Sequence, residues 1–112
     1  MRYWESDPNR LRKSGVAEVD GEDRVLSFEE KPSNPRSNWC TPPFYCYVRE
    51  DVRRIPEAIA DGCGTDAPGS LAAWMCRHSA VYSMEMPGKR YDIGDIESYE
   101  NVQRIYKGIV RQ

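Results

Sequence analysis

Two short stretches of alternating apolar and polar residues, joined by a tight turn, constrain the fold of this chain most. The first covers Gly15–Val19, the second covers residues 24–29, and Asp20-Gly21-Glu22-Asp23 lies between them. Alternation with a period of two is typical of a strand with one buried face, and a short polar link with glycine is typical of a hairpin turn. The sequence therefore predicts a β-hairpin over residues 15–29.

Strand-like and helix-like patterns alternate along the rest of the chain. Residues 3–4 and 81–86 are expected to be strands, and residues 32–43 a proline-rich loop. Residues 44–48 are nearly all apolar, which predicts a strand buried on both faces. Helices are expected within residues 51–61, from Ser70 as N-cap, and from Asp95 as N-cap. The apolar face of the last helix would comprise Ile96, Tyr99, Val102, Tyr106 and Ile109. Interleaved strands and helices indicate an α/β fold.

The amino-acid composition and net charge limit the classes of function that this chain can have. The chain has 112 residues, enough for one small domain, with 39% hydrophobic and 30% charged residues. A net charge of −2 does not favour nucleic acid as a partner. No apolar run approaches the roughly 20 residues of a membrane span, and the N-terminus has no signal-peptide pattern, so a cytoplasmic location is expected. The four cysteines and His78 lack compact metal-ligand spacing, which favours free thiols.

Two motifs carry side chains suited to chemistry. Glu30-Lys31-Pro32 ends the second hairpin strand, where a carboxylate and a lysine can hold a polyol and its phosphate. Tyr91-Asp92-Ile93-Gly94 precedes the last helix, where an aspartate at a strand end can bind a metal. If both motifs end strands of an open α/β sheet, Lys31 and Asp92 should lie near each other at its carboxyl edge.

Each of these residues also has a structural interpretation. Lys31 can be a solvated charge at a strand end, and Asp92 can be a turn residue that stabilises entry into a helix. Gly15 can be a turn glycine. Tyr45 can be a core residue. The basic run over residues 10–13 is typical of a solvated loop.

In this order the motifs resemble sugar-1-phosphate nucleotidyltransferases, a family that includes glucose-1-phosphate thymidylyl- and uridylyltransferases and mannose-1-phosphate guanylyltransferases. The similarity extends over residues 7–106. Its other elements are Asp7-Pro8 followed by Gly15-Val16, Ser37-Asn38 followed by Phe44-Tyr45, and Asp66-Ala67-Pro68-Gly69 before a helix.

The resemblance implies a fold and a set of roles. The fold would be the C-terminal part of a Rossmann-like nucleotidyltransferase fold, with a mixed sheet and flanking helices. Gly15 would let the backbone approach the sugar, Glu30 would hydrogen-bond its hydroxyls, and Tyr45 would line its site. Lys31 would bind the phosphate. Asp92 would be one of two catalytic aspartates that hold Mg²⁺.

The chain also departs from the family pattern. It contains no G-x-G-T-R-like nucleotide loop, and Thr41-Pro42-Pro43 stands where many members have a small residue and a glycine. Residues 1–112 are therefore expected to form one domain, a C-terminal fragment without the nucleotide-binding half. Its expected partners are a sugar-1-phosphate, a nucleoside triphosphate only with the missing half, and a second copy or a complementary chain. The alternative is a non-catalytic module for sugar-phosphate binding or assembly.

Overall fold

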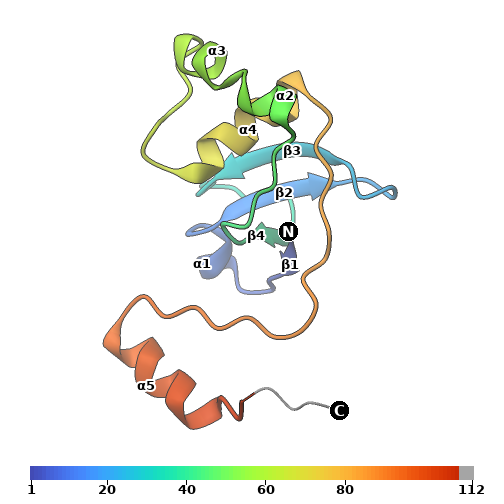
Figure 1. Cartoon of the computed structure of the whole chain (residues 1–112). Coiled ribbons are helices and arrows are strands. Elements are labelled where there is room, and N and C mark those ends of the chain that lie inside the picture. The colour runs from blue at the N-terminus through green and yellow to red at the C-terminus, as the bar shows by residue number, and fades with distance from the viewer. Residues whose placement is uncertain (109–112) are drawn as a thin grey trace.

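Four strands form one sheet in a computed structural model, which describes residues 1–108 (Figure 1). Their order is β1 (Tyr3–Trp4), β4 (Trp39–Thr41), β2 (Gly15–Val19) and β3 (Val25–Glu30). The hairpin predicted over residues 15–29 is confirmed as β2 and β3. Neighbouring strands run antiparallel at every pairing among these four strands. The chain is therefore α/β in composition, but these four strands share no common carboxyl edge.

Helices cover both faces of the sheet. The short helix α1 (Pro8–Leu11) packs on one face, where Leu11 joins Val16 of β2 and Cys40 of β4. The longest helix, α4 (Pro68–His78), packs on the other face through Ala72. There it meets a buried group from the hairpin: Ala17, Val25 and Phe28. Because side chains alternate along a strand, β2 contributes to both small cores.

A second layer of helix lies beyond α4. The helix α3 (Ile55–Ala60) places Ala58 against Trp74 and Met75 of α4, which are 2% and 1% exposed. Pro56 lies in the first turn of α3, as predicted, where its missing N–H leaves no bond unmade. A single turn, α2 (Arg49–Val52), precedes α3. None of the helices in residues 1–108 is long and apolar enough to cross a membrane.

The central prediction for residues 32–48 is wrong. The expected buried strand over residues 44–48 has no regular structure, and Phe44 and Val48 are each 61% exposed. The strand is β4, which lies in the expected loop. Pro42 and Pro43 follow β4 directly and lack the N–H groups that a ladder needs. The apolar run keeps a strand's alternation of inward and outward side chains without its pairing.

Two further predictions need correction. The helix α4 begins at Pro68 with Ala67 at its N-cap, so Ser70 lies inside the helix. Pro68 starts the helix without a polar cap because its fixed φ already suits the first turn. Residues 81–86 form no strand but make isolated bridges with residues that flank β3 and β1, pairing Arg24 with Tyr82 and Arg2 with Glu85. This segment therefore touches both outer strands of the sheet.

The last helix, α5 (Ile96–Ile105), stands apart from the sheet in Figure 1. Asp95 is its N-cap, as predicted, and forms a capping box with Ser98. Hydrogen bonds from Ser98 hold the pKa of the Asp95 carboxyl below its usual value. The expected burial of its apolar face is not seen, since Ile96 is 77% and Tyr99 50% exposed. Ile109 lies outside the described residues.

Candidate functional site

Three residues form a row across the sheet at one end of the hairpin. The register places Gly15 of β2 opposite Glu30 of β3 on one side and opposite Thr41 of β4 on the other. Residues directly opposite in a sheet project to the same face. The missing side chain of Gly15 lets the Phe28 ring, the Thr41 hydroxyl and the Glu30 carboxylate lie close to its backbone. A Cβ at Gly15 would lie 2.7 Å from Thr41 Oγ1 and 2.7 Å from Phe28 Cζ, so no larger residue fits.

The start of α4 packs against this row of residues, on the face to which Glu30 projects. Gly69 is the second residue of α4 and is buried. A Cβ at Gly69 would overlap Glu30 Oε2, and it would also approach Phe28 Cε1 at 3.0 Å. Two glycines thus flank the Glu30 carboxylate, with the buried ring of Phe28 beside them. We call the row Glu30, Gly15 and Thr41, together with Gly69, the glycine slot.

Tyr45 lies at the border of the glycine slot. Its ring packs against the core group that contains Phe28 and Ala72. Burial raises the pKa of the Tyr45 hydroxyl, the Thr41 side chain opposes that rise, and the Glu30 carboxylate adds to it. Tyr45 is therefore within electrostatic reach of both polar side chains of the slot. The structure supports its core role and also places it beside Thr41 and beside Glu30, one of the predicted sugar ligands.

Lys31 directly follows β3. Its backbone N–H donates to Ser14 O at 3.0 Å, which fixes the chain just beyond the glycine slot. Its φ of 48° is left-handed, an uncommon conformation for a residue with a side chain. The side chain is exposed. A hollow of about 500 Å³ adjoins this position and is lined by Glu29, Glu30, Pro32, Ser33, Asn34 and Arg36.

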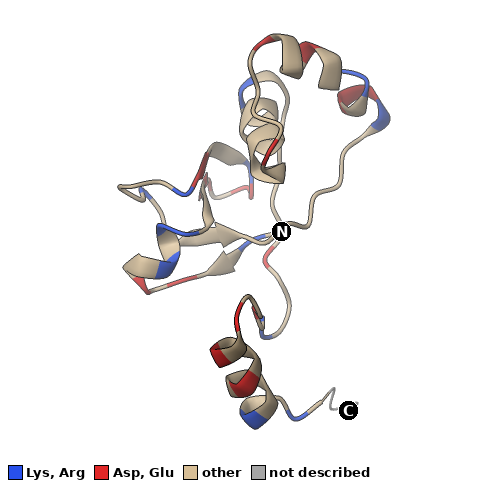
Figure 2. Ribbon diagram, turned by 90° about the vertical axis from the view of Figure 1, so that its left-hand side faces the viewer, with Lys and Arg blue, Asp and Glu red and all other residues tan. Residues whose placement is uncertain are grey.

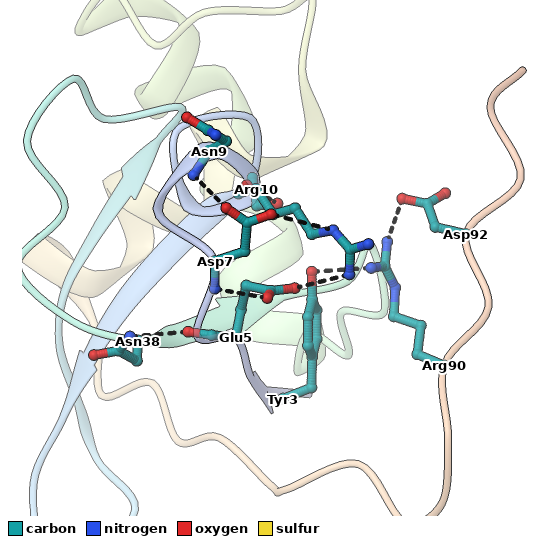
Figure 3. A network of polar contacts seen from close by, with 9 residues as sticks. Tyr3, Glu5, Asp7, Asn9, Arg10, Asn38, Arg90 and Asp92 are labelled. Atoms are coloured by element: carbon teal, nitrogen blue, oxygen red, sulfur yellow. Dashed lines mark hydrogen bonds and ion pairs between the residues drawn. The ribbon is translucent and has the colours of Figure 1, made fainter. Parts of the chain in front are cut away.

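Asp92 lies in the segment before α5 and does not end a strand. Arg90 Nη2 donates to Asp92 Oδ2 at 2.8 Å, and Arg90 Nη1 donates to the Tyr3 hydroxyl at 2.9 Å (Figure 3). The Arg90 guanidinium also lies 4.6 Å from the centre of the Tyr3 ring. Arg90 therefore fastens the segment that carries Asp92 to β1. The Asp92 side chain remains 71% exposed.

A second hollow, of about 700 Å³, lies beside Asp92. Its charged lining residues are four basic and four acidic ones: Arg10, Lys13, Lys89 and Arg90, and Glu5, Glu85, Asp92 and Asp95. Neither sign dominates this lining, and Figure 2 shows basic and acidic segments interspersed along the ribbon. Arg10 is held by Glu5 at 3.8 Å and by Asp7 at 3.7 Å (Figure 3). Ser14 also lines this hollow and accepts the backbone hydrogen bond of Lys31.

These contacts connect the predicted residues only in part. Gly15, Glu30 and Tyr45 meet at the glycine slot, and Lys31 is the next residue after Glu30. Asp92 belongs to the second hollow, whose lining includes Ser14, the backbone partner of Lys31, but not Lys31 itself. Arg10 and Lys13, which the sequence assigned to a solvated loop, line that hollow as well.

Residues 1–108 do not form a complete magnesium site by themselves. Within residues 1–108 no group of three or more His, Cys, Asp or Glu side chains is arranged to hold a metal ion. Mg²⁺ requires an octahedral set of oxygen ligands, and Asp92 supplies one carboxylate that already binds Arg90. Any metal at this position needs further ligands.

Sequence reasoning gave Gly69 no role of its own. It appeared only as the last residue of Asp66-Ala67-Pro68-Gly69 before a helix. A signal was nevertheless present, because glycine in the first turn of a helix is a poor helix former and suggests a need for close approach. Thr41 was noted only as a departure from the family pattern, and the sheet register explains why it faces Gly15.

All the comparisons with known proteins reported below match this chain to nucleotidyltransferases. The profile of the family described as nucleotidyl transferase matches residues 2–108. Glucose-1-phosphate thymidylyltransferases from two strains of Xanthomonas campestris pv. campestris, B100 and ATCC 33913, are 44% identical over 45 residues. That match covers 40% of this chain and 14% of each relative. A glucose-1-phosphate adenylyltransferase from Fervidobacterium nodosum is 25% identical over 87 residues, covering 76% of this chain and 21% of the relative. The chain thus spans a minor part of the curated relatives it matches.

Proposed function

Because the chain belongs to the nucleotidyl transferase family, we propose that it supplies the sugar-phosphate-binding part of an enzyme that makes a nucleotide-sugar. That enzyme joins a sugar-1-phosphate to a nucleoside triphosphate and releases pyrophosphate. The observation that carries the proposal is the glycine slot, where Gly15 brings Glu30 and Thr41 together on one face of the sheet directly before Lys31.

The slot suits a hydroxylated ring that carries a phosphate. The Glu30 carboxylate accepts hydrogen bonds from sugar hydroxyls, and Gly15 lets the ring approach the sheet. Lys31 neutralises the phosphate whose oxygen attacks the α-phosphorus of the triphosphate. Nucleotidyl transfer depends mainly on positioning and on charge neutralisation, which is the work that these groups can perform.

We propose Asp92 as one carboxylate ligand of a Mg²⁺ ion whose remaining ligands come from other parts of the enzyme or from its substrates. Magnesium would neutralise phosphate charge there. In residues 1–108 the Asp92 carboxylate binds Arg90, so Arg90 would have to release it. The proposal for Asp92 rests on the family rather than on a metal cluster.

The whole enzyme would contain a Rossmann-like nucleotidyltransferase domain, of which residues 1–112 are a C-terminal fragment, and it would work in the cytoplasm. The alternative is a non-catalytic module for sugar-phosphate binding or assembly. The observation that favours the alternative is that the sequence contains no G-x-G-T-R-like loop for the triphosphate. Both proposals require sugar-phosphate binding at the glycine slot.

The pure chain is expected to bind glucose 1-phosphate but to transfer no nucleotide. Titration followed by NMR should shift the amide signals of Gly15, Glu30 and Gly69 more than those of Gly21, a turn glycine with open space around it. With nucleoside triphosphates and Mg²⁺ added, pyrophosphate release should stay at background. Absence of binding would contradict the proposed site, and steady turnover would contradict the fragment.

Self-association or a complementary chain is expected to cover the apolar surface of α5. Four large apolar side chains on or next to this helix are 40–77% exposed: Ile96, Tyr99, Ile105 and Tyr106. Several exposed large apolar side chains on one short helix are typical of an interaction site. Sedimentation at micromolar concentration should show a dimer or larger species, and Ile96→Asp should shift it toward monomer more than Leu26→Asp, which alters a β3 side chain that is 60% exposed. A stable wild-type monomer would leave a different chain as the proposed partner.

A further inference from the structure

We propose that Gly69 is a positioning residue, which sets where the Glu30 carboxylate lies and thereby gives the site its preference for a hydroxylated ring over bare phosphate. This inference rests on the proposed sugar-phosphate site. Gly69 belongs to α4, 39 positions after Glu30 in the sequence, and contacts it only because α4 packs across β3. Gly69 would touch no ligand itself.

The position of the Glu30 carboxylate, and not the backbone conformation, depends on glycine at position 69. The φ of Gly69 is in the ordinary negative range, since only Gly62, Gly88 and Gly108 have positive φ among the glycines of residues 1–108. A Cβ there would overlap Glu30 Oε2 and would lie 3.1 Å from Glu30 Cδ. The carboxylate would have to turn away, because the backbone of α4 is held by Ala72, Trp74 and Met75 in the core.

The carboxylate that Gly69 positions has unused hydrogen-bonding capacity. Within residues 1–108 no donor is hydrogen-bonded to the Glu30 side chain, and no cation is paired with it. The first turn of α4 carries partial positive charge, and the Glu30 carboxylate lies beside it. An ionised carboxylate accepts through both of its oxygens. The exposed Glu30 carboxylate thus lies against Gly69 with its hydrogen-bonding positions open for ligand hydroxyls.

Helix propensity alone predicts that Gly69→Ala does no harm. Alanine is favoured over glycine inside a helix by about 1 kcal/mol, so Gly69→Ala should stabilise α4 if Gly69 had only a structural role. Under the proposal, Gly69→Ala displaces the Glu30 carboxylate and removes the contribution of the sugar ring to binding. The phosphate contact of Lys31 remains.

The test compares glucose 1-phosphate and inorganic phosphate as ligands of the pure chain, with affinities measured by NMR titration. Gly69→Ala should weaken glucose 1-phosphate binding by about tenfold or more, the loss expected for one hydrogen bond to a charged group. Phosphate binding should change less than about twofold. Gly21→Ala is the matched control, because a Cβ at Gly21 meets nothing within 4 Å, and it should leave both affinities unchanged.

A second variant tests whether Gly69 acts through Glu30. Glu30→Asp shortens the side chain and withdraws its carboxyl group from position 69. In that background, adding Gly69→Ala should lower glucose 1-phosphate affinity by less than about twofold, because the overlap has been relieved. Equal losses in the two backgrounds would overturn the proposal.

Different results would contradict the role of Gly69 and the proposed sugar-phosphate site. If the wild-type chain prefers glucose 1-phosphate and Gly69→Ala keeps that preference, the role of Gly69 is overturned while the proposed function stands. If the wild-type chain shows no preference, the proposed function fails and the inference with it. The ¹³C carboxyl signal of Glu30 gives a reading that needs no ligand. It should shift in Gly69→Ala and not in Gly21→Ala, and an unchanged signal would overturn the positioning role.

Discussion

Replacing Trp74 with alanine is expected to lower the free energy of unfolding by about 3–5 kcal/mol, the usual cost of removing a large buried aromatic side chain. Trp74 is 2% exposed and packs with Ala58 of α3 and Met75 of its own helix. Its indole Nε1 donates to Asp61 Oδ2 at 3.1 Å, and its ring stacks on that of His78 at 4.0 Å. Alanine would leave a cavity between α3 and α4.

Urea denaturation followed by circular dichroism measures this loss. Trp4→Ala is the matched control, because Trp4 is 60% exposed and its main aromatic contact is an edge-on one with Trp39. Trp4→Ala should lower the free energy of unfolding by only about 1 kcal/mol. Equal losses for the two variants would show that α3 and α4 are not a cooperative part of the fold. Since Gly69 lies at the start of α4, a loosened α4 should also weaken the glycine slot.

Replacing Lys31 with glutamine is expected to weaken glucose 1-phosphate binding by about 10- to 150-fold, which corresponds to the roughly 1.5–3 kcal/mol of one charge-assisted hydrogen bond. Glutamine is a shorter, uncharged side chain that replaces the ammonium with a neutral amide. The left-handed φ of 48° at this position disfavours β-branched replacements, so glutamine also avoids additional backbone strain. The loss should shrink at high salt, because the exposed ammonium is screened there.

Lys107→Gln is the control for Lys31→Gln. Lys107 is an exposed lysine that follows α5 and lines neither hollow. NMR titration with glucose 1-phosphate should give wild-type affinity for this control. If Lys31→Gln and Lys107→Gln behave alike, Lys31 is a solvated charge at a strand end, and its assignment to the phosphate is wrong.

Local sequence patterns predicted the elements whose structure depends on neighbours in the chain. The hairpin of β2 and β3 follows from alternation and a short polar turn. The start of α5 follows from Asp95, whose side chain accepts from the backbone of Ser98 only three residues away. The first turn of α3 follows from Pro56, whose fixed φ suits that position. In each case the deciding interaction is short in range.

Tertiary pairing decided the elements that the sequence misplaced. Residues 44–48 have the composition of a buried strand, but Pro42 and Pro43 end β4 before them. Residues 81–86 alternate like a strand and yet make only isolated bridges, because few of their backbone groups meet a partner strand. The apolar face of α5 was read correctly as a pattern, but nothing in residues 1–108 packs against it closely enough to bury Ile96. The composition of a segment indicates which secondary structure its side chains favour. It does not indicate which strand or helix the segment will pack against.

The order of the candidate groups along the chain is local information: a glycine, a carboxylate next to a lysine, and an aspartate before a helix. Which of these groups meet depends on how the strands and helices pack in three dimensions. The antiparallel register brings Gly15 between Glu30 and Thr41, and the packing of α4 brings Gly69 against Glu30. Asp92 instead lines another hollow, where Arg90 binds both its carboxylate and the Tyr3 hydroxyl. Contacts between residues so far apart in the chain depend on strand register and helix packing, which no local pattern encodes.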